Sequence, residues 1–98
     1  MYCVRQGDVL LVSVDAVPDT AQKQEGRCIL AMGEVTGHAH EVPLGGQIWV
    51  DVDHRYLEIL QDTKLTHQEH EHIQLRPGLF EIVIQREYSP EEVRSVQD

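Results

Sequence analysis

The stretch LFEIVIQRE, residues 79–87, decides the fold class, because its side chains alternate more clearly than those of any other segment. On an extended strand, Phe80, Ile82 and Ile84 point to one face, and the residues between them point to the other. A period of two residues is typical of a strand that buries one face. The segment therefore predicts a β-strand with its apolar face in the core.

Similar runs precede this segment, and turn signals such as Pro18–Asp19, PLGG and RPG separate them. In QIWVDV, the alternation places Ile48, Val50 and Val52 on one strand face. The runs expected to form strands are GDVLLVSV at 7–14, RCILAM at 27–32, EVTGHAHEV at 34–42, QIWVDV at 47–52, RYLEILQ at 55–61 and HIQL at 72–75.

The tail SPEEVRSVQ, residues 89–97, is the one segment with a helical pattern. Ser89 is suited to the N-cap, Pro90 to the first helical position, and two glutamates follow in the first turn. The sequence therefore predicts an all-β fold: a small antiparallel barrel or sandwich of about 7–8 short strands with a short C-terminal helix. Residues 1–98 are expected to form this single β-barrel domain.

Composition sets limits on the location of the chain. Its 98 residues are 41% apolar, enough for one modest core. There is no run of about eighteen apolar residues, so no membrane-spanning helix is expected. Arg5 and Asp8 stand where an export signal needs an apolar stretch, which predicts a cytoplasmic protein. Cys3 and Cys28 form no metal-binding motif and are expected to be reduced there.

The formal net charge is −9, and acids outnumber bases in both halves of the chain. Nucleic acid is therefore an improbable partner, because its binding requires a basic face. An acidic surface keeps a protein soluble and attracts cations or a basic protein partner. Open strand edges would also allow two copies to pair, so a homodimer is among the expectations.

Five of the six histidines fall in two short segments, VTGHAHEV and LTHQEHEHIQL. In the first, His38 and His40 share a face of a regular strand and offer two imidazole ligands to one metal. Glu41 faces the opposite side if the strand is regular. The alternative is a solvated or structural pair of histidines, because H-x-H alone is common.

The second segment allows two geometries. On a regular strand, His70 and His72 share a face and His67 does not. If the chain turns at residues 68–71, His67 and His70 come together and His72 stays outside. The charged string QEHEH is typical of a loop tip and favours the turn.

Together the two segments suggest a site for zinc, or for iron or another divalent transition metal, with zinc expected first, because imidazole suits these ions. The expected ligands are His38, His40, His67 and His70, with His72 as the substitute. Such a metal would either brace the fold or take part in a small hydrolytic or oxidative reaction. The candidate carboxylate ligands or bases are Glu41, Glu69 and Glu71.

Two other functions stay open from the residues alone. Arg86 and Tyr88 share a strand face and, with a histidine pair, would supply the groups of a metal-free enzyme that cleaves phosphodiesters. Alternatively, the chain is an acidic accessory module that binds a protein partner or mimics nucleic acid, without catalysis. Whether the chain is an enzyme is therefore undecided from the sequence. His54, set among acids in DVDHRY, is expected at the surface.

The segments QGDVLLV, GEVTGHAHEV, LTHQEHEHIQLRPGLFEI and QREYSPEE together resemble a family of small bacterial proteins of uncharacterised function. This resemblance implies that the GHAH and HxxH segments belong together. A second resemblance is to the cupins, in which H-x-H and a glutamate join a later histidine around a divalent metal. His38 and His40 match its first part, whereas Glu41 lies too close to them to match the cupin glutamate. The resemblance to the cupins implies a β-barrel with a bound metal, and it implies no particular reaction.

Overall fold

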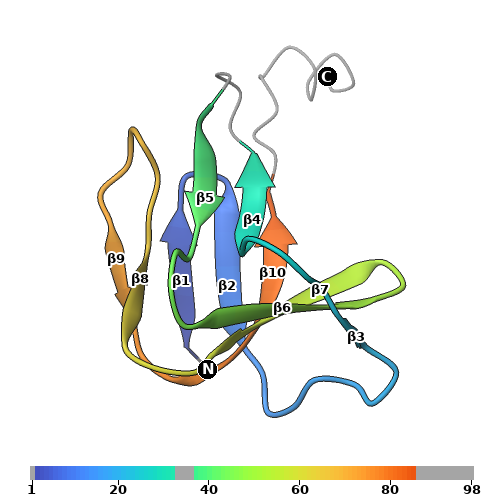
Figure 1. Ribbon diagram of the computed structural model, residues 1–98. Helices are drawn as coiled ribbons and strands as arrows, with labels where there is room; N and C mark the ends of the chain where they lie inside the picture. Colours follow the sequence, from blue (N-terminus) through green and yellow to red (C-terminus); the bar gives the residue numbers. More distant parts are fainter. Residues whose placement is uncertain (1, 33–36, 86–98) are drawn as a thin grey trace, which may run out of the picture.

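The computed structural model describes residues 2–32 and 37–85, and these residues form an antiparallel all-β fold, as predicted (Figure 1). This part of the chain contains ten strands and no helix. The strands are β1 (Cys3–Gln6), β2 (Val9–Ser13), β3 (Gln22–Lys23), β4 (Ile29–Met32), β5 (Ala39–Glu41), β6 (Gly46–Asp51), β7 (His54–Ile59), β8 (Thr63–Leu65), β9 (Ile73–Leu75) and β10 (Gly78–Ile84). Nor do these residues include a helix long and apolar enough to cross a membrane.

Six strands form the main sheet, in the order β1-β2-β10-β7-β6-β3. The segment with the clearest alternation, β10, lies inside this sheet and pairs with β2 on one side and β7 on the other. Phe80 and Ile82 of β10 are buried, as their parity predicts, and Ile84 packs against the core. β10, the longest strand, is therefore an inner strand of the main sheet, paired on both sides.

Two hairpins contribute the rest of the core, β4–β5 and β8–β9. Their buried side chains join those of the main sheet in one apolar cluster. Arg55 of β7 also links the main sheet to β4, because its guanidinium donates to the carbonyl oxygens of Leu30 (2.7 Å) and Ile29 (3.1 Å). The cluster consists of Val4, Val9, Leu11, Cys28, Leu30, Val42, Ile48, Leu57, Ile59, Leu65, Leu75, Phe80 and Ile82.

Of the predicted barrel or sandwich, the described residues do not form a closed barrel. The strands at the two ends of the main sheet, β1 and β3, each pair with a single neighbour there. β3 is only two residues long, which ends the pairing at that side. The hairpins supply core residues to the sheet instead of closing it. The strand count is also higher than expected, because several of the strands are three residues long or shorter.

Val52 departs from its predicted place on the β6 strand face. β6 ends at Asp51 and β7 begins at His54, and these two residues pair directly. Val52 therefore stands in a two-residue turn, where it is 88% exposed and has a φ of 55°. The alternation of QIWVDV continues one residue beyond the point at which the chain reverses.

Two further expectations concern the C-terminal tail and the cysteines. The predicted helix over residues 89–97 lies outside the described residues. Cys3 is exposed, Cys28 is buried, and both are free thiols, as expected. Burial, followed by the negative charge of Glu41, raises the pKa of Cys28 to about 11, so this thiol stays protonated at neutral pH.

Candidate functional site

The rings of four histidines, His38, His40, His67 and His70, gather in space. Their segments, the start of β5 and the β8–β9 connection, lie with the β1–β2 connection at one end of the molecule (Figure 1). The ring centres of His40 and His67 are 4.3 Å apart, and those of His67 and His70 are 4.6 Å apart. The centres of His38 and His67 are separated by 5.7 Å. These four are the histidines that the sequence predicts as ligands, so the structure brings the two segments together.

A short backbone pairing sets this arrangement. Glu41 and Thr66 exchange two main-chain hydrogen bonds, of 3.0 and 2.8 Å, in an isolated antiparallel bridge. In that register, His40 lies opposite His67, and His38 lies opposite Glu69. The chain pairing therefore explains why these side chains meet across a separation of almost thirty residues.

The β8–β9 connection turns in the manner of the second predicted geometry. The main-chain N–H of Glu69 donates to Nδ1 of His67 (3.0 Å), which closes a tight local turn. His67 is buried and its ring faces His70, while His72 is exposed. Of the two geometries, the structure therefore has the one in which the rings of His67 and His70 come together and His72 lies outside.

The β1–β2 turn packs against two rings of the cluster, those of His40 and His70. Gly7 has a φ of 61°, and a side chain there would approach Nε2 of His70 to 2.8 Å and Cε1 of His40 to 3.2 Å. Glycine is required at this position for both its backbone angle and the close approach of the two rings. The next residue, Asp8, places Oδ1 3.5 Å from Nε2 of His40.

Gln6 fixes the buried ring of His40. Its Nε2 donates to two carbonyl oxygens, those of Leu65 (3.1 Å) and Glu71 (2.9 Å), so its Oε1 is the atom 2.8 Å from Nδ1 of His40. An amide oxygen only accepts, and therefore Nδ1 of His40 carries a proton. In the neutral ring, Nε2 then has a free lone pair on the side of Asp8.

The two buried rings are held neutral. Burial, supported by the nearby His67, lowers the pKa of His40, and the carboxylate of Asp8 only partly opposes this. Burial also lowers the pKa of His67, with His70 and His38 adding to the effect. Neutral imidazoles keep a nitrogen lone pair, which is the form that binds a metal ion at neutral pH.

The outer side of the cluster holds a second imidazole–carboxylate pair. Nδ1 of His38 lies 3.5 Å from Oε2 of Glu69, and both side chains reach solvent. Gln68 accepts a hydrogen bond from the main-chain N–H of Ala39 (2.8 Å), which fixes the loop to the start of β5. Glu69 is thus the predicted carboxylate that the structure brings to the histidines.

The other predicted residues lie elsewhere. The carboxylate of Glu41 accepts two hydrogen bonds from Arg27, at 2.8 and 3.1 Å, on the opposite face of β5, as its parity predicts. Glu71 is exposed and contributes only its main-chain oxygen, to Gln6. Arg86 and Tyr88 lie outside the described residues. His54 is at the surface, as expected, with Nδ1 2.9 Å from Glu81.

Sequence reasoning missed two residues of the site, Gln6 and Asp8. The signal that could have found them is the Gly7–Asp8 pair, which forms a two-residue turn between alternating strands. That signal locates a turn, but it does not say which other loop the turn will meet.

The cluster is not a ready-made metal site. Among residues 2–32 and 37–85, no three His, Cys, Asp or Glu side chains stand in an arrangement that holds a metal ion directly. The ring centres of these described histidines are close in space, but their side chains are not in a metal-holding arrangement. Metal binding here requires side-chain rotation.

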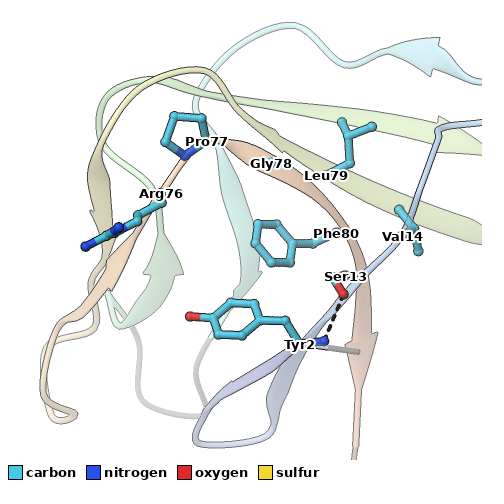
Figure 2. Close-up of a pocket in the computed structure, with 8 residues that line it drawn as sticks. All are labelled: Tyr2, Ser13, Val14, Arg76, Pro77, Gly78, Leu79 and Phe80. Atoms are coloured by element: carbon cyan, nitrogen blue, oxygen red, sulfur yellow. Dashed lines mark hydrogen bonds between the residues drawn. The ribbon is translucent and has the colours of Figure 1, made fainter.

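A separate pocket of about 490 Å³ lies around the start of β10, where the ring of Tyr2 stands beside that of Phe80 (Figure 2). The pocket is apart from the histidine cluster and shares no residue with it. Its lining consists of Tyr2, Ser13, Val14, Arg76, Pro77, Gly78, Leu79 and Phe80.

Comparison with known proteins gives one result. No curated protein and no solved structure matches the chain. A family model described as a domain of unknown function (DUF8820) matches residues 5–85, which include Gln6, Asp8 and all four clustered histidines. The resemblance to the cupins stays a prediction. Because this match covers most of the 98 residues, the chain belongs to the DUF8820 family of domains of unknown function.

Proposed function

We propose that this protein binds a divalent transition metal, zinc before others, at the histidine cluster. The observation that carries the proposal is the pair formed by Nε2 of His40 and Oδ1 of Asp8, 3.5 Å apart. Both atoms are acceptors when the ring is neutral and the carboxylate is ionised, so a cation between them relieves their repulsion. An acceptor pair of this kind, with the ring of His40 buried and the carboxylate of Asp8 reaching solvent, is suited to a metal ion.

The separation of the two atoms fits this role. Zinc binds histidine nitrogen and carboxylate oxygen at about 2.0–2.2 Å, so two ligands in a tetrahedral shell lie about 3.4 Å apart. Nε2 of His40 and Oδ1 of Asp8 are at nearly this separation already. The Nδ1–H of His40 bonds to Gln6, as the second nitrogen of a metal-bound histidine commonly bonds to an oxygen.

His70 is the proposed third ligand. Its Nε2 and the ring of His40 both lie against Gly7, and its exposed position leaves it free to rotate toward Asp8. His67 is less suited as a metal ligand, because of the hydrogen bond that its ring already makes. Its Nδ1 accepts from the main chain of Glu69, so its Nε2 carries the proton and has no lone pair for a metal.

Three protein ligands leave a position for water. The side chain of Asp8 is 37% exposed, so this side of the site is open to solvent. A metal in such a site lowers the pKa of its bound water and supports hydrolysis, whereas a closed shell of four ligands braces a fold. We therefore propose a hydrolytic role before a structural one.

Metal content tests the proposal. Tag-free protein, purified without chelators and exposed to excess Zn²⁺ before dialysis, is expected to hold about one ion per chain. His40→Ala and His70→Ala are each expected to lose most of it. His54→Ala is the matched control, because this histidine bonds Glu81 on the outer face of the main sheet.

Two results would contradict the proposal. The first is wild-type protein that holds far less than one equivalent of zinc, nickel, cobalt or iron after this treatment. The second is His40→Ala protein that keeps the folded spectrum and full metal content. A coordination shell without bound water, measured by X-ray absorption, would replace the hydrolytic role with a structural one.

If no metal binds, the acidic interaction module becomes the better account of the chain. It has support of its own on the outer face of the main sheet. There Trp49 and Tyr56 stand in one cross-strand row with Glu81 of β10. Glu58 accepts a hydrogen bond from the indole of Trp49 (3.1 Å). Aromatic rings beside carboxylates are suited to a basic protein partner.

A further inference from the structure

We infer that Gln6 is a positioning residue, which holds His40 as its Nδ1–H tautomer and so leaves Nε2 as the atom offered to a ligand. The tautomer of His40 is a property of the metal-free protein. The second half of the inference, that this tautomer governs metal affinity, rests on the proposed metal site.

The orientation of the Gln6 amide follows from its surroundings. Gln6 is 3% exposed, so main-chain and side-chain groups supply its hydrogen bonds. Its Nε2 has two carbonyl acceptors, those of Leu65 and Glu71. Reversing the amide would place an oxygen against both carbonyls and break both bonds, which is costly in a buried position. Oε1 therefore stays turned toward His40.

His40 has no other choice of proton position while this contact lasts. Its Nδ1 lies 2.8 Å from Oε1 of Gln6 and must donate to it. Its ring is 3% exposed, so water does not compete for that hydrogen bond. Without Gln6, the carboxylate of Asp8, 3.5 Å from Nε2, would favour the opposite tautomer.

The same amide of Gln6 also holds the loop that carries His67 and His70. Leu65 and Glu71 stand at the two ends of the loop that carries His67 and His70, and Gln6 donates to both. This one side chain therefore fixes the tautomer of His40 and the position of the loop opposite. Loss of such supporting contacts commonly lowers metal affinity about 10- to 100-fold.

The neighbouring ring supplies an internal contrast. The main-chain N–H of Glu69 donates to Nδ1 of His67, so that ring carries its proton on Nε2. Two imidazoles with centres 4.3 Å apart are thus expected in opposite tautomers. A merely general effect of burial would not produce this difference.

The test is long-range ¹H–¹⁵N NMR of the metal-free wild-type protein at a pH where both rings are neutral. We expect His40 with its proton on Nδ1 and His67 with its proton on Nε2. In Gln6→Leu, the nitrogen shifts of His40 are expected to move toward the other tautomer. Gln47→Leu is the matched control, since Gln47 also donates to two carbonyls, those of Gln24 (2.8 Å) and Ile48 (2.9 Å).

Wild-type protein with His40 protonated on Nε2 would overturn the inference, whether or not Gln6→Leu folds. Zn²⁺ titration then tests the second half. We expect Gln6→Leu to bind Zn²⁺ about 10- to 100-fold more weakly than wild type and Gln47→Leu to bind it unchanged. Equal affinity in Gln6→Leu would overturn this half. If wild-type protein does not bind Zn²⁺, the proposed function fails, and the tautomer result stands on its own.

Discussion

At position 52, a β-branched residue holds a left-handed backbone conformation in the β6–β7 turn. Val52 has a φ of 55° and is 88% exposed, so it contributes strain and almost no burial. Left-handed backbone costs an L-residue about 1–2 kcal/mol, and glycine is free of this cost. We expect Val52→Gly to raise the free energy of unfolding by about 1 kcal/mol, measured by urea denaturation.

The neighbouring turn residue gives the control. Asp53 does not have a positive φ, so Asp53→Gly gains nothing from glycine and loses some stability through the entropy of the unfolded chain. A Val52→Gly protein that is less stable than wild type would show that the turn is not strained at this position.

Single residues also show how far the sequence could predict this molecule. The parity of Phe80 and Ile82 identified the buried face of β10, and the parity of Glu41 placed its carboxylate away from the histidines. Parity failed at Val52, because alternation says which way a side chain points and not where the strand ends. Alternation therefore predicts the strand face on which a side chain lies better than it predicts the residue at which the strand ends.

At the scale of elements, the β1–β2 hairpin has two functions, because its turn also supports the histidines. Gly7→Ala adds a methyl group 2.8 Å from Nε2 of His70 at a φ of 61°. We expect it to lower the free energy of unfolding by about 1–2 kcal/mol and to displace the ring of His70. Thermal unfolding measures the first effect, and the NMR shifts of His70 measure the second.

Gly26→Ala separates strain from contact. Gly26 has a φ of 97°, but a methyl group there meets nothing within 4 Å. It is expected to lower stability while leaving the shifts of His70 unchanged. If both variants shift His70 equally, the contact beneath that ring is not what Gly7 protects.

The elements that the sequence predicts least well are those that meet across the site. The strand runs and the turn at residues 68–71 have local signals, and both are present. The bridge between Glu41 and Thr66 and the approach of Asp8 to His40 have none, because they depend on the packing of three separate hairpins. Gln6 and Asp8 were therefore missed. Gln6 lies before the predicted strand run at 7–14, and Asp8, expected within that run, stands in the β1–β2 turn.

For the whole molecule, the clustered histidines predict how stability changes with pH. Burial lowers the pKa of His40 and of His67 below the usual 6.5. Near and below pH 6.5, the unfolded chain therefore binds more protons than the folded one, and stability falls as the pH falls. Each histidine contributes at most about 1.4 kcal/mol per pH unit to this slope. Urea denaturation between pH 7.5 and 5.5, with chelator present, measures it.

Two comparisons isolate this effect. His67→Asn keeps an acceptor for the N–H of Glu69 but cannot titrate, so its stability should fall less steeply with pH. His54 acts in the opposite direction. Its hydrogen bond to Glu81 raises its pKa, so its contribution is present at low pH and is lost as the pH rises through that pKa. An unchanged slope in His67→Asn would contradict the assignment.

The position of the site at the meeting point of three hairpins has a consequence for folding. Its groups come from residues 6–8, 38–40 and 67–70, so no local segment contains a working set. Closing such long loops is slow and costs entropy that only the packed core offsets. We therefore expect the site to form late, when the hairpins dock, so that a partly folded chain lacks its full set of groups.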